Sequence, residues 1–281
     1  MREFNGKAAF VTGGASGIGL ALGRAFAEAG MRVMLADIET EALDAAVASL
    51  AGLGPGVRGV VCDVSDPDSV ERAAAAAFAA FGEVHVVCNN AGVGAGGGID
   101  RISLADWRWV LDVNLMGVLH GIRTFLPHLR AHGRGGHFVN TASMAGMISG
   151  LGFSAYAASK FAVVAMSEGL AIELKPLGIG VSVLCPGFVR TRILESGRNR
   201  QERYGDPSAV AEIAGAASAA ATQMAELVRN GVGPQEVARR VLGAIRNDEL
   251  YVFTDALMRG PLEARLQGIL AAYDRAAAAQ G

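Results

Sequence analysis

The sequence predicts an α/β fold in which a doubly wound parallel sheet carries helices on both faces. Three observations favour this fold. Short apolar runs alternate with helix-like segments of about 10–15 residues, which is typical of βαβ units. The first apolar run leads into the glycine-rich segment TGGASGIG, residues 12–19. Polar residues follow most of the apolar runs. In a parallel sheet these positions lie at the carboxyl ends of the strands, where ligands bind.

Size and composition predict one globular domain, residues 1–281. Of the 281 residues, 51% are hydrophobic and 19% are charged, enough to bury one large core. The 25 basic and 27 acidic residues give a formal charge of −2, which disfavours nucleic acid and anionic membranes as partners. No apolar run is long enough to span a membrane and the N-terminus lacks a signal-peptide pattern, so we expect a cytoplasmic protein.

The first unit reads as strand, glycine turn and helix. Gly13 would permit the tight turn, Gly17 would let the backbone approach a pyrophosphate, and Gly19 would allow close packing of helix on strand. The helix start also offers free N–H groups to phosphates, with the Ser16 hydroxyl as a further donor. The spacing GxxxGxG differs from the commoner GxGxxG, so a plain glycine turn remains an alternative for this motif alone.

The second predicted strand ends at Asp37, which lies 18 residues beyond Gly19. In a dinucleotide-binding fold, an acid at about that distance accepts hydrogen bonds from the adenosine ribose and repels a 2′-phosphate. Neither Ser16 nor Ile38 offers a cation to such a phosphate. We therefore expect NAD as the cofactor and disfavour NADP, although Asp37 could instead cap the helix that follows.

The same alternation continues to the C-terminus. The predicted strands span residues 7–11, 32–36, 57–62, 84–88, 137–141, 180–185 and 251–254. The predicted helices span residues 39–50, 67–81 and 104–131, the last with a bend near Gly117 or Pro127, and two more begin near Tyr156 and at Pro234.

Two segments exceed what the sheet requires. Residues 192–233 follow the sixth strand and include an Ala-rich helix over about 209–228. An insertion beyond the carboxyl end of a strand overhangs the ligand crevice, so we expect a substrate lid, with an ordinary solvated loop as the alternative. A helical tail over about 260–281 is expected to act as a lid or a subunit contact.

The stretch from Ser143 to Lys160 has spacings that suit proton transfer. If Tyr156 opens a helix, Lys160 lies one turn further on the same face. A phenol has a pKa of ~10, and a nearby ammonium would lower it by favouring the phenolate. An isolated YxxxK is most often a pair of helix neighbours, so its context decides. Asn114 lies inside the apolar run VLDVNLMGVL and must find partners, as a core bridge or as part of a site.

The cysteines and histidines do not predict a metal site. The sequence has an odd number of cysteines, Cys62, Cys88 and Cys185, which lie far apart at the ends of apolar runs. We therefore expect buried thiols instead of disulfides or zinc ligands. His128 and His132 have helical metal spacing, but no third ligand accompanies them, and a solvated helix end is the better interpretation.

Together the motifs resemble those of the short-chain dehydrogenase/reductase family. They are TGGASGIG at 12–19, NNAG at 89–92, Asn114, Ser143, Tyr156-xxx-Lys160 and Pro186-Gly187, and their order and spacing are similar to the family's over residues 5–255. The resemblance implies an NAD(P)(H)-dependent oxidoreductase with a Rossmann-like sheet of about seven strands. The segment after Thr191 also resembles bacterial Cα-dehydrogenases that oxidise benzylic alcohols of lignin-type aryl ethers, which implies a bulky or aromatic secondary alcohol.

The family resemblance assigns four catalytic roles. Ser143 would hydrogen-bond the substrate oxygen, and Tyr156 would be the general base in oxidation or the acid in reduction. Lys160 would hold the nicotinamide ribose and lower the Tyr156 pKa, while Asn114 would hold a water in a proton relay.

The implied cofactor contacts cover the whole dinucleotide. Asp63 and Val64 would contact the adenine, residues 90–92 the central region, and residues 186–191 the nicotinamide side. The full cofactor set is Gly13, Ser16, Gly17, Ile18, Gly19, Asp37, Ile38, Asp63, Val64, Asn90, Ala91, Gly92, Tyr156, Lys160, Pro186, Gly187, Val189 and Thr191.

The family resemblance also implies a homotetramer or homodimer that pairs the helices carrying Asn114 and Tyr156. Small residues on the Tyr156 helix, such as Ala157, Ala158, Ala162 and Ala165, would let two helices approach closely. Two other classes stay open: a catalytically inactive nucleotide-binding regulatory protein, and an epimerase or dehydratase of nucleotide-sugars. A regulatory protein would have little need of the catalytic residues, and the nucleotide-sugar enzymes usually have a larger C-terminal domain.

Overall fold

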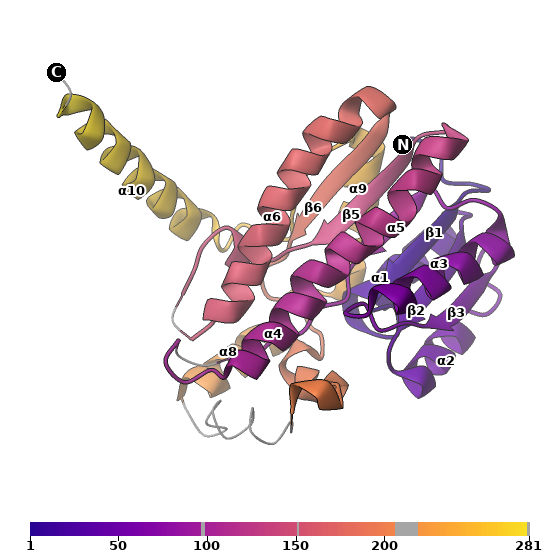
Figure 1. Ribbon diagram of the computed structural model, residues 1–281, viewed down its shortest axis with the longest axis horizontal. Coiled ribbons are helices and arrows are strands. Elements are labelled where there is room, and N and C mark those ends of the chain that lie inside the picture. Colours follow the sequence, from indigo (N-terminus) through magenta and orange to yellow (C-terminus); the bar gives the residue numbers. More distant parts are fainter. Residues whose placement is uncertain (97–98, 151, 206–218, 280–281) are drawn as a thin grey trace.

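A computed structural model describes residues 1–96, 99–150, 152–205 and 219–279 (Figure 1). One seven-stranded sheet has the order β3-β2-β1-β4-β5-β6-β7, and every neighbouring pair is parallel. The strands are β1 Ala8–Thr12, β2 Arg32–Asp37, β3 Val57–Val61, β4 Val86–Asn89, β5 Gly136–Thr141, β6 Ile179–Cys185 and β7 Tyr251–Phe253. The predicted Rossmann-like sheet is therefore confirmed.

The α-helices between and after these strands have the following bounds. They are α1 Gly17–Glu28, α2 Thr40–Ser49, α3 Pro67–Phe81, α4 Leu104–Leu111, α5 Gly117–His132, α6 Ser154–Leu174, α8 Ala219–Arg229, α9 Pro234–Asn247 and α10 Arg259–Ala278.

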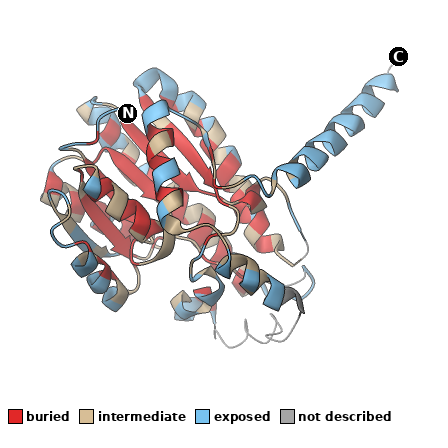
Figure 2. Ribbon diagram, turned by 180° about the vertical axis from the view of Figure 1, so that it is seen from behind, coloured by how far each residue is buried: buried red, intermediate tan, exposed pale blue. Residues whose placement is uncertain are grey.

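Two hydrophobic cores lie on opposite faces of the sheet. Helices α3, α5 and α6 contribute to one core, and α1, α2 and α9 to the other. Within β1, Phe10 belongs to the first core and Val11 to the second, because neighbouring strand residues point to opposite faces. Figure 2 shows the sheet buried between these layers. Burial on both faces explains why the strands read as continuous apolar runs.

The strand order reverses direction between β1 and β4. The chain runs outward from β1 through β2 to β3, returns to β4 on the other side of β1, and continues outward to β7. Open parallel sheets bind ligands outside the carboxyl ends of the strands at such a switch point. The fold therefore places the candidate site beside the glycine turn after β1 and the NNAG segment after β4.

The predicted long helix over residues 104–131 is interrupted. A π-helical turn, Asp112–Met116, separates α4 from α5 and directly precedes Gly117. Pro127 lies within α5, which continues to His132. The irregularity near Gly117 thus comes from a π turn, a feature that is frequent at functional sites.

The insertion and the tail are helical where the structure describes them. After β6 come two short 3₁₀ segments, Ile193–Asn199 and Glu202–Tyr204, and then α8. The first part of the helix predicted over 209–228 lies outside the described residues. Helix α10 projects away from the body and contributes no buried residue (Figures 1 and 2).

The three cysteines are buried, as expected, and His128 and His132 lie near the C-terminal end of α5. All three cysteines are free and buried, and burial raises the pKa of each thiol. His128 stacks on Phe78, with ring centres 4.0 Å apart, and His132 hydrogen-bonds the Val84 carbonyl. Within the described part of the chain, no cluster of three metal-binding side chains occurs. None of the described helices combines the length and the hydropathy needed to cross a membrane.

Candidate active site

Helix α6 brings Tyr156 and Lys160 together as predicted. It begins at Ser154, so Tyr156 lies in the first turn and Lys160 one turn later. The Lys160 ammonium lies 5.6 Å from the centre of the Tyr156 ring and donates a 2.8 Å hydrogen bond to the Thr141 carbonyl at the end of β5. Lys160 is buried, so its reach toward the tyrosine is fixed by packing between α6 and the sheet.

Ser143 joins this pair from the loop after β5. Its hydroxyl accepts a 3.0 Å hydrogen bond from the Ala145 N–H, and a hydrogen bond links it to the Tyr156 side chain. The neighbouring Met144 N–H donates to the Pro186 carbonyl over 2.9 Å, which draws the loop after β6 to the same place. The structure thus gathers a hydroxyl, a phenol and an ammonium at the carboxyl ends of β5 and β6.

Burial dominates the protonation of both ionisable groups. Burial raises the pKa of Tyr156, and the hydrogen bond with Ser143 opposes this only in part. Burial also lowers the pKa of Lys160 to about 8. The net shift of the Tyr156 pKa in the chain alone is upward because of burial, and the expected lowering by Lys160 stays a prediction. Each charged form loses hydration in this packed site, so the phenol stays neutral until further positive charge is present.

Asn114 is a core bridge and also a neighbour of the site. Its Oδ1 accepts a 2.8 Å hydrogen bond from the Val93 N–H, and its Nδ2 donates to the Val93 carbonyl and to Ser159 Oγ. A Cβ placed on Gly92 would lie 3.4 Å from Asn114 Oδ1 and 3.5 Å from Lys160 Nζ. The π turn therefore holds Asn114 next to the lysine, while its role in a proton relay stays a prediction.

The glycine turn fits a dinucleotide phosphate site. Gly13 and Gly17 have φ angles of 63° and 53°, a region that favours glycine. A Cβ on Gly13 would lie 2.9 Å from Ala91 Cα, and one on Gly19 would lie 2.0 Å from the Gly13 carbonyl oxygen. Gly19 thus packs against the turn itself. A side chain at Gly13 or Gly19 would therefore collide with neighbouring backbone, so only glycine fits these two positions.

Helix α1 presents its N-terminus at this turn. Ser16 precedes the helix, and its side chain makes no capping hydrogen bond. The first N–H groups of a helix have no internal partner and carry partial positive charge, so they suit a pyrophosphate. Ile18 lies half-buried in the first turn and packs against the second core. The residues present therefore fit the phosphates of a dinucleotide.

The Asp37 side chain connects the end of β2 to the glycine turn by a hydrogen bond. Its Oδ2 accepts a 2.9 Å hydrogen bond from the Ala15 N–H, and its Oδ1 accepts one of 3.1 Å from the Glu39 N–H. The cap residue of α2 is Glu39, so the alternative that Asp37 caps the helix is wrong. Asp37 and the half-buried Ile38 thus stand at the edge of the glycine turn, where the sequence places the adenosine ribose.

Thr12 is a site residue that the sequence reasoning missed. Its hydroxyl accepts hydrogen bonds from the N–H groups of Asn90 (2.9 Å) and Ala91 (3.0 Å). The Asn90 side chain in turn donates to the Thr12 carbonyl over 3.0 Å. The segments after β1 and β4 are thereby locked together. A hydroxyl at a strand end was the only sequence signal for this role.

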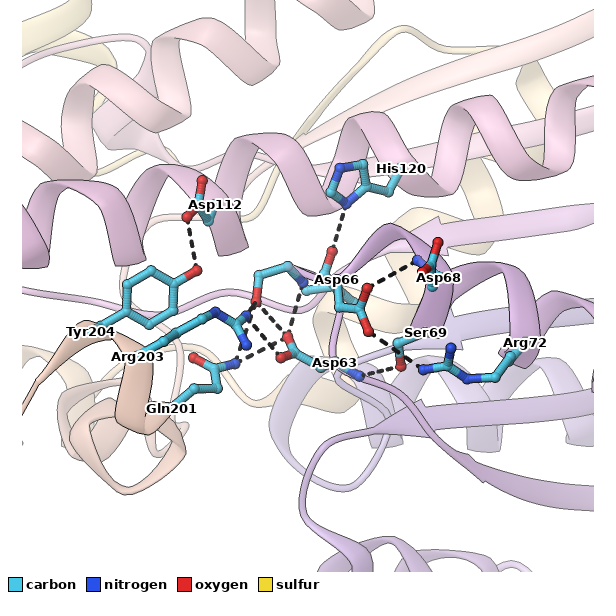
Figure 3. Close-up of polar contacts among 12 residues, drawn as sticks. Asp63, Asp66, Asp68, Ser69, Arg72, Asp112, His120, Gln201, Arg203 and Tyr204 are labelled. Atoms are coloured by element: carbon cyan, nitrogen blue, oxygen red, sulfur yellow. Dashed lines mark hydrogen bonds and ion pairs between the residues drawn. The ribbon is translucent and has the colours of Figure 1, made fainter.

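The insertion reaches the residues expected to hold adenine (Figure 3). Gln201 and Arg203 donate 3.0 Å hydrogen bonds to the two oxygens of the Asp63 carboxylate. The Val64 carbonyl hydrogen-bonds the His120 ring over 2.9 Å. Gln201 and Arg203 lie 138 and 140 residues from Asp63, so no local pattern could reveal these contacts.

Residues 193–205 cross the carboxyl edge of the sheet. Ser196 accepts a 3.1 Å hydrogen bond from the Gly94 N–H after β4, and Arg203 pairs with Asp63 after β3. Arg198 pairs with Glu39 after β2. Residues 193–205 therefore contact the segments that follow β2, β3 and β4, while the role of the insertion as a substrate lid stays a prediction.

The loop after β6 completes the set of predicted residues. The Gly187 N–H donates a 3.0 Å hydrogen bond to Thr254, and Val189 forms a β-bridge with Val232. A Cβ on Gly17 would lie 3.1 Å from the Thr191 methyl group, so this loop reaches the glycine turn. The loop after β6 thus lies near both the glycine turn and the segment that carries Ser143.

Comparisons with known proteins define the class. A model of the short chain dehydrogenase family matches residues 7–202. The chain belongs to this family, and it is an oxidoreductase that acts on CH–OH donors.

Particular relatives extend the likeness to nearly the whole chain. A Cα-dehydrogenase from Sphingobium sp. strain SYK-6 is 34% identical, over 96% of this chain and 87% of its own. The 1-deoxy-11-beta-hydroxypentalenate dehydrogenase of Streptomyces exfoliatus is 43% identical, over 89% and 83%. The crystal structure of a short chain dehydrogenase/reductase from Burkholderia phymatum in complex with NAD has a TM-score of 0.90 at 39% identity, covering 96% of both chains.

Proposed function

We propose that this chain is an NAD(H)-dependent dehydrogenase that interconverts a secondary alcohol and a ketone, with Tyr156 as the general acid or base. The observation that carries the proposal is the cluster of Ser143, Tyr156 and Lys160 in the same fold as a tightly packed glycine turn. A regulatory nucleotide-binding protein would have no use for that cluster. The named dehydrogenases among the relatives support the same reaction class.

Each catalytic side chain has a separate task in this proposal. When bound, NAD⁺ supplies the hydride acceptor and a positive charge. Ser143 orients the substrate hydroxyl, and Tyr156 takes its proton as the carbinol hydrogen leaves. Added positive charge favours the phenolate, which offsets the burial that raises the Tyr156 pKa in the chain alone. Lys160 holds the ribose and keeps a cation beside the phenol.

The proposed cofactor is NAD, with NADP disfavoured. Asp37 places a carboxylate, held by Ala15 and Glu39, beside the glycine turn. A 2′-phosphate there would meet like charge, whereas ribose hydroxyls could donate hydrogen bonds to it. The NAD in the Burkholderia phymatum structure supports this choice.

The proposed substrate is a bulky or aromatic secondary alcohol. The relatives' names, a Cα-dehydrogenase and a hydroxypentalenate dehydrogenase, support a large substrate. The insertion provides additional surface at the carboxyl edge of the sheet, and we propose that it acts as a lid. Three buried, unpaired thiols suit the reducing cytoplasm, which is the compartment we propose.

Incubation with NAD⁺ and a panel of secondary alcohols, followed by NADH absorbance, tests the proposal. We expect turnover of a 1-aryl secondary alcohol with NAD⁺ and much weaker turnover with NADP⁺. NAD⁺ binding without oxidation of any panel member would favour a regulatory protein. Conversion of a nucleotide-sugar without net NADH formation would favour an epimerase.

The proposed assembly is a homodimer or homotetramer that pairs α5 and α6 with a second copy. On α6, Ala158 and Ala165 are exposed, and Ile172 is 76% exposed. Ala157, which the sequence also offered as a small contact residue, is buried within the chain. An exposed face with small and apolar residues suits close helix pairing. Light scattering at micromolar concentration should therefore give at least twice the chain mass, and a monomer would contradict the proposal.

A further inference from the structure

Arg198 and Glu39 form a two-pronged ion pair between the insertion and the segment after β2. Arg198 Nε donates to both carboxylate oxygens of Glu39 over 3.1 and 3.2 Å, and its NH2 lies 2.9 Å from Glu39 Oε1. The two side chains are only 24% and 26% exposed. Burial acts to raise the pKa of Glu39, but the hydrogen bonds from Arg198 and Asn199 outweigh it and the pKa is lowered. The Glu39 carboxylate is therefore ionised and paired with Arg198.

The Arg198 guanidinium has no group left for another anion. Its remaining NH1 donates to the carbonyls of Arg192 and Glu195 over 3.2 and 2.9 Å. All three nitrogens of the guanidinium are thus engaged, and a carboxylate occupies the two that face Glu39. The neighbouring cation in this segment, Arg192, is likewise paired with a carboxylate, that of Glu195, over 2.7 Å.

The ion pair stands beside the candidate adenosine site. Glu39 lies two residues after Asp37, and its N–H donates to the Asp37 carboxylate. Asn199, next to Arg198, hydrogen-bonds Glu39 and has a buried Oδ1 without a partner among the described residues. The Oε1 atom of Gln201 is also buried without a hydrogen-bond partner among the described residues. Two unpartnered acceptors in this segment are what a ligand that donates hydrogen bonds, such as adenosine, would satisfy.

We propose that the Glu39–Arg198 pair is a second determinant of cofactor choice, in which Glu39 holds a guanidinium that would otherwise bind the 2′-phosphate of NADP. The inference rests on the proposed function, because it concerns the adenosine half of the same site. Asp37 excludes the phosphate by like charge, and Glu39 occupies the Arg198 guanidinium, a cation that could receive it. Arginine binds phosphate through two parallel N–H bonds, which is the arrangement that Glu39 now occupies. Cofactor choice is therefore set by three residues, one of which belongs to the insertion.

Binding of two adenosine fragments separates these contributions without any turnover. ADP and adenosine 2′,5′-bisphosphate would be titrated by calorimetry into wild type, Asp37→Ser, and Asp37→Ser/Glu39→Gln. Replacing Asp37 removes its repulsion of a 2′-phosphate, and removing the Glu39 charge frees the Arg198 guanidinium to bind that phosphate. The double variant should gain about tenfold in the ratio of bisphosphate to ADP affinity over Asp37→Ser, the scale of one charged hydrogen-bonded contact.

Two further variants show whether Arg198 is the receiving cation. Adding Arg198→Met to the double variant should abolish the tenfold gain. Glu263→Gln, in the Asp37→Ser background, is the matched control, because Glu263 pairs with Arg259 on the projecting helix α10. It should leave the affinity ratio unchanged. Glu39→Thr serves as a second version of the key substitution, and circular dichroism checks that each variant is folded.

The outcomes distinguish this inference from the proposed function. An affinity ratio that is the same in Asp37→Ser and in both Glu39 double variants would overturn the inference, as would a gain that persists in Arg198→Met. Failure of the wild type to bind ADP or NAD⁺ at all would instead overturn the proposed dinucleotide site.

Discussion

Tyr156→Phe should lower kcat for alcohol oxidation by about 10²–10⁴-fold, the usual contribution of general acid–base catalysis. The substitution keeps the ring and its packing in the first turn of α6 but removes the only ionisable atom. Stability and NAD⁺ affinity should therefore stay close to those of the wild type. Stopped-flow NADH formation would measure the loss in rate, and calorimetry would measure cofactor binding.

The pH profile identifies the group that carries the proton. The base must be ionised to accept a proton, so wild-type kcat/KM for oxidation should rise with pH. Burial raises the Tyr156 pKa, so this limb depends on the positive charge brought by NAD⁺ and should disappear in Tyr156→Phe. Tyr251→Phe is the matched control, because a hydrogen bond with Glu168 raises the pKa of Tyr251 to about 12 on β7. Near-native rates and an unchanged profile in Tyr156→Phe would assign the proton to another group.

Arg200→Met should destabilise the fold by about 3 kcal/mol, the lower end of the cost of breaking a buried ion pair. Arg200 and Asp106 form a 2.5 Å pair whose side chains are only 3% and 4% exposed. The loss should not exceed that range, because Asp106 keeps hydrogen bonds from the N–H and hydroxyl of Ser103. The guanidinium also lies 5.1 Å from the Trp109 ring, so tryptophan fluorescence should report the change during denaturant unfolding.

A second arginine in the same segment provides the control for this result. Arg192 pairs with Glu195 on the surface, where the side chains are 52% and 60% exposed. Exposed pairs contribute little to stability, so Arg192→Met should change the unfolding free energy little. Equal effects of the two substitutions would show that the buried pair does not anchor the insertion on α4.

The sheet was predictable because its signals are local. Most strands are largely apolar runs, and a polar residue at or just after the last strand residue, such as Asp37 or Asn90, marks the carboxyl end of a parallel strand. The proximity of Tyr156 and Lys160 was predictable for the same reason, since residues four apart along a helix lie on one face. Family resemblance then supplied the order of the motifs, and the matching family model confirms it.

The remaining features depend on contacts between distant segments. Arg198 lies 159 residues from Glu39, so nothing near either residue could predict their pairing. The π turn at Asn114 follows from that side chain's bonds to Val93, 21 residues away. The upward shift of the Tyr156 pKa could not be predicted, because the sequence shows the neighbouring ammonium but not the burial of the phenol.

Transfer of deuterium from a labelled substrate tests the central claim most directly. A 1-aryl secondary alcohol with deuterium on its carbinol carbon would be oxidised by the wild type with NAD⁺, and the products analysed by mass spectrometry. Direct hydride transfer predicts one deuterium in each NADH formed, together with one equivalent of unlabelled ketone, and no such transfer to NADP⁺. Label released to water, or ketone formed without labelled NADH, would contradict an NAD-dependent dehydrogenase built on Ser143, Tyr156 and Lys160.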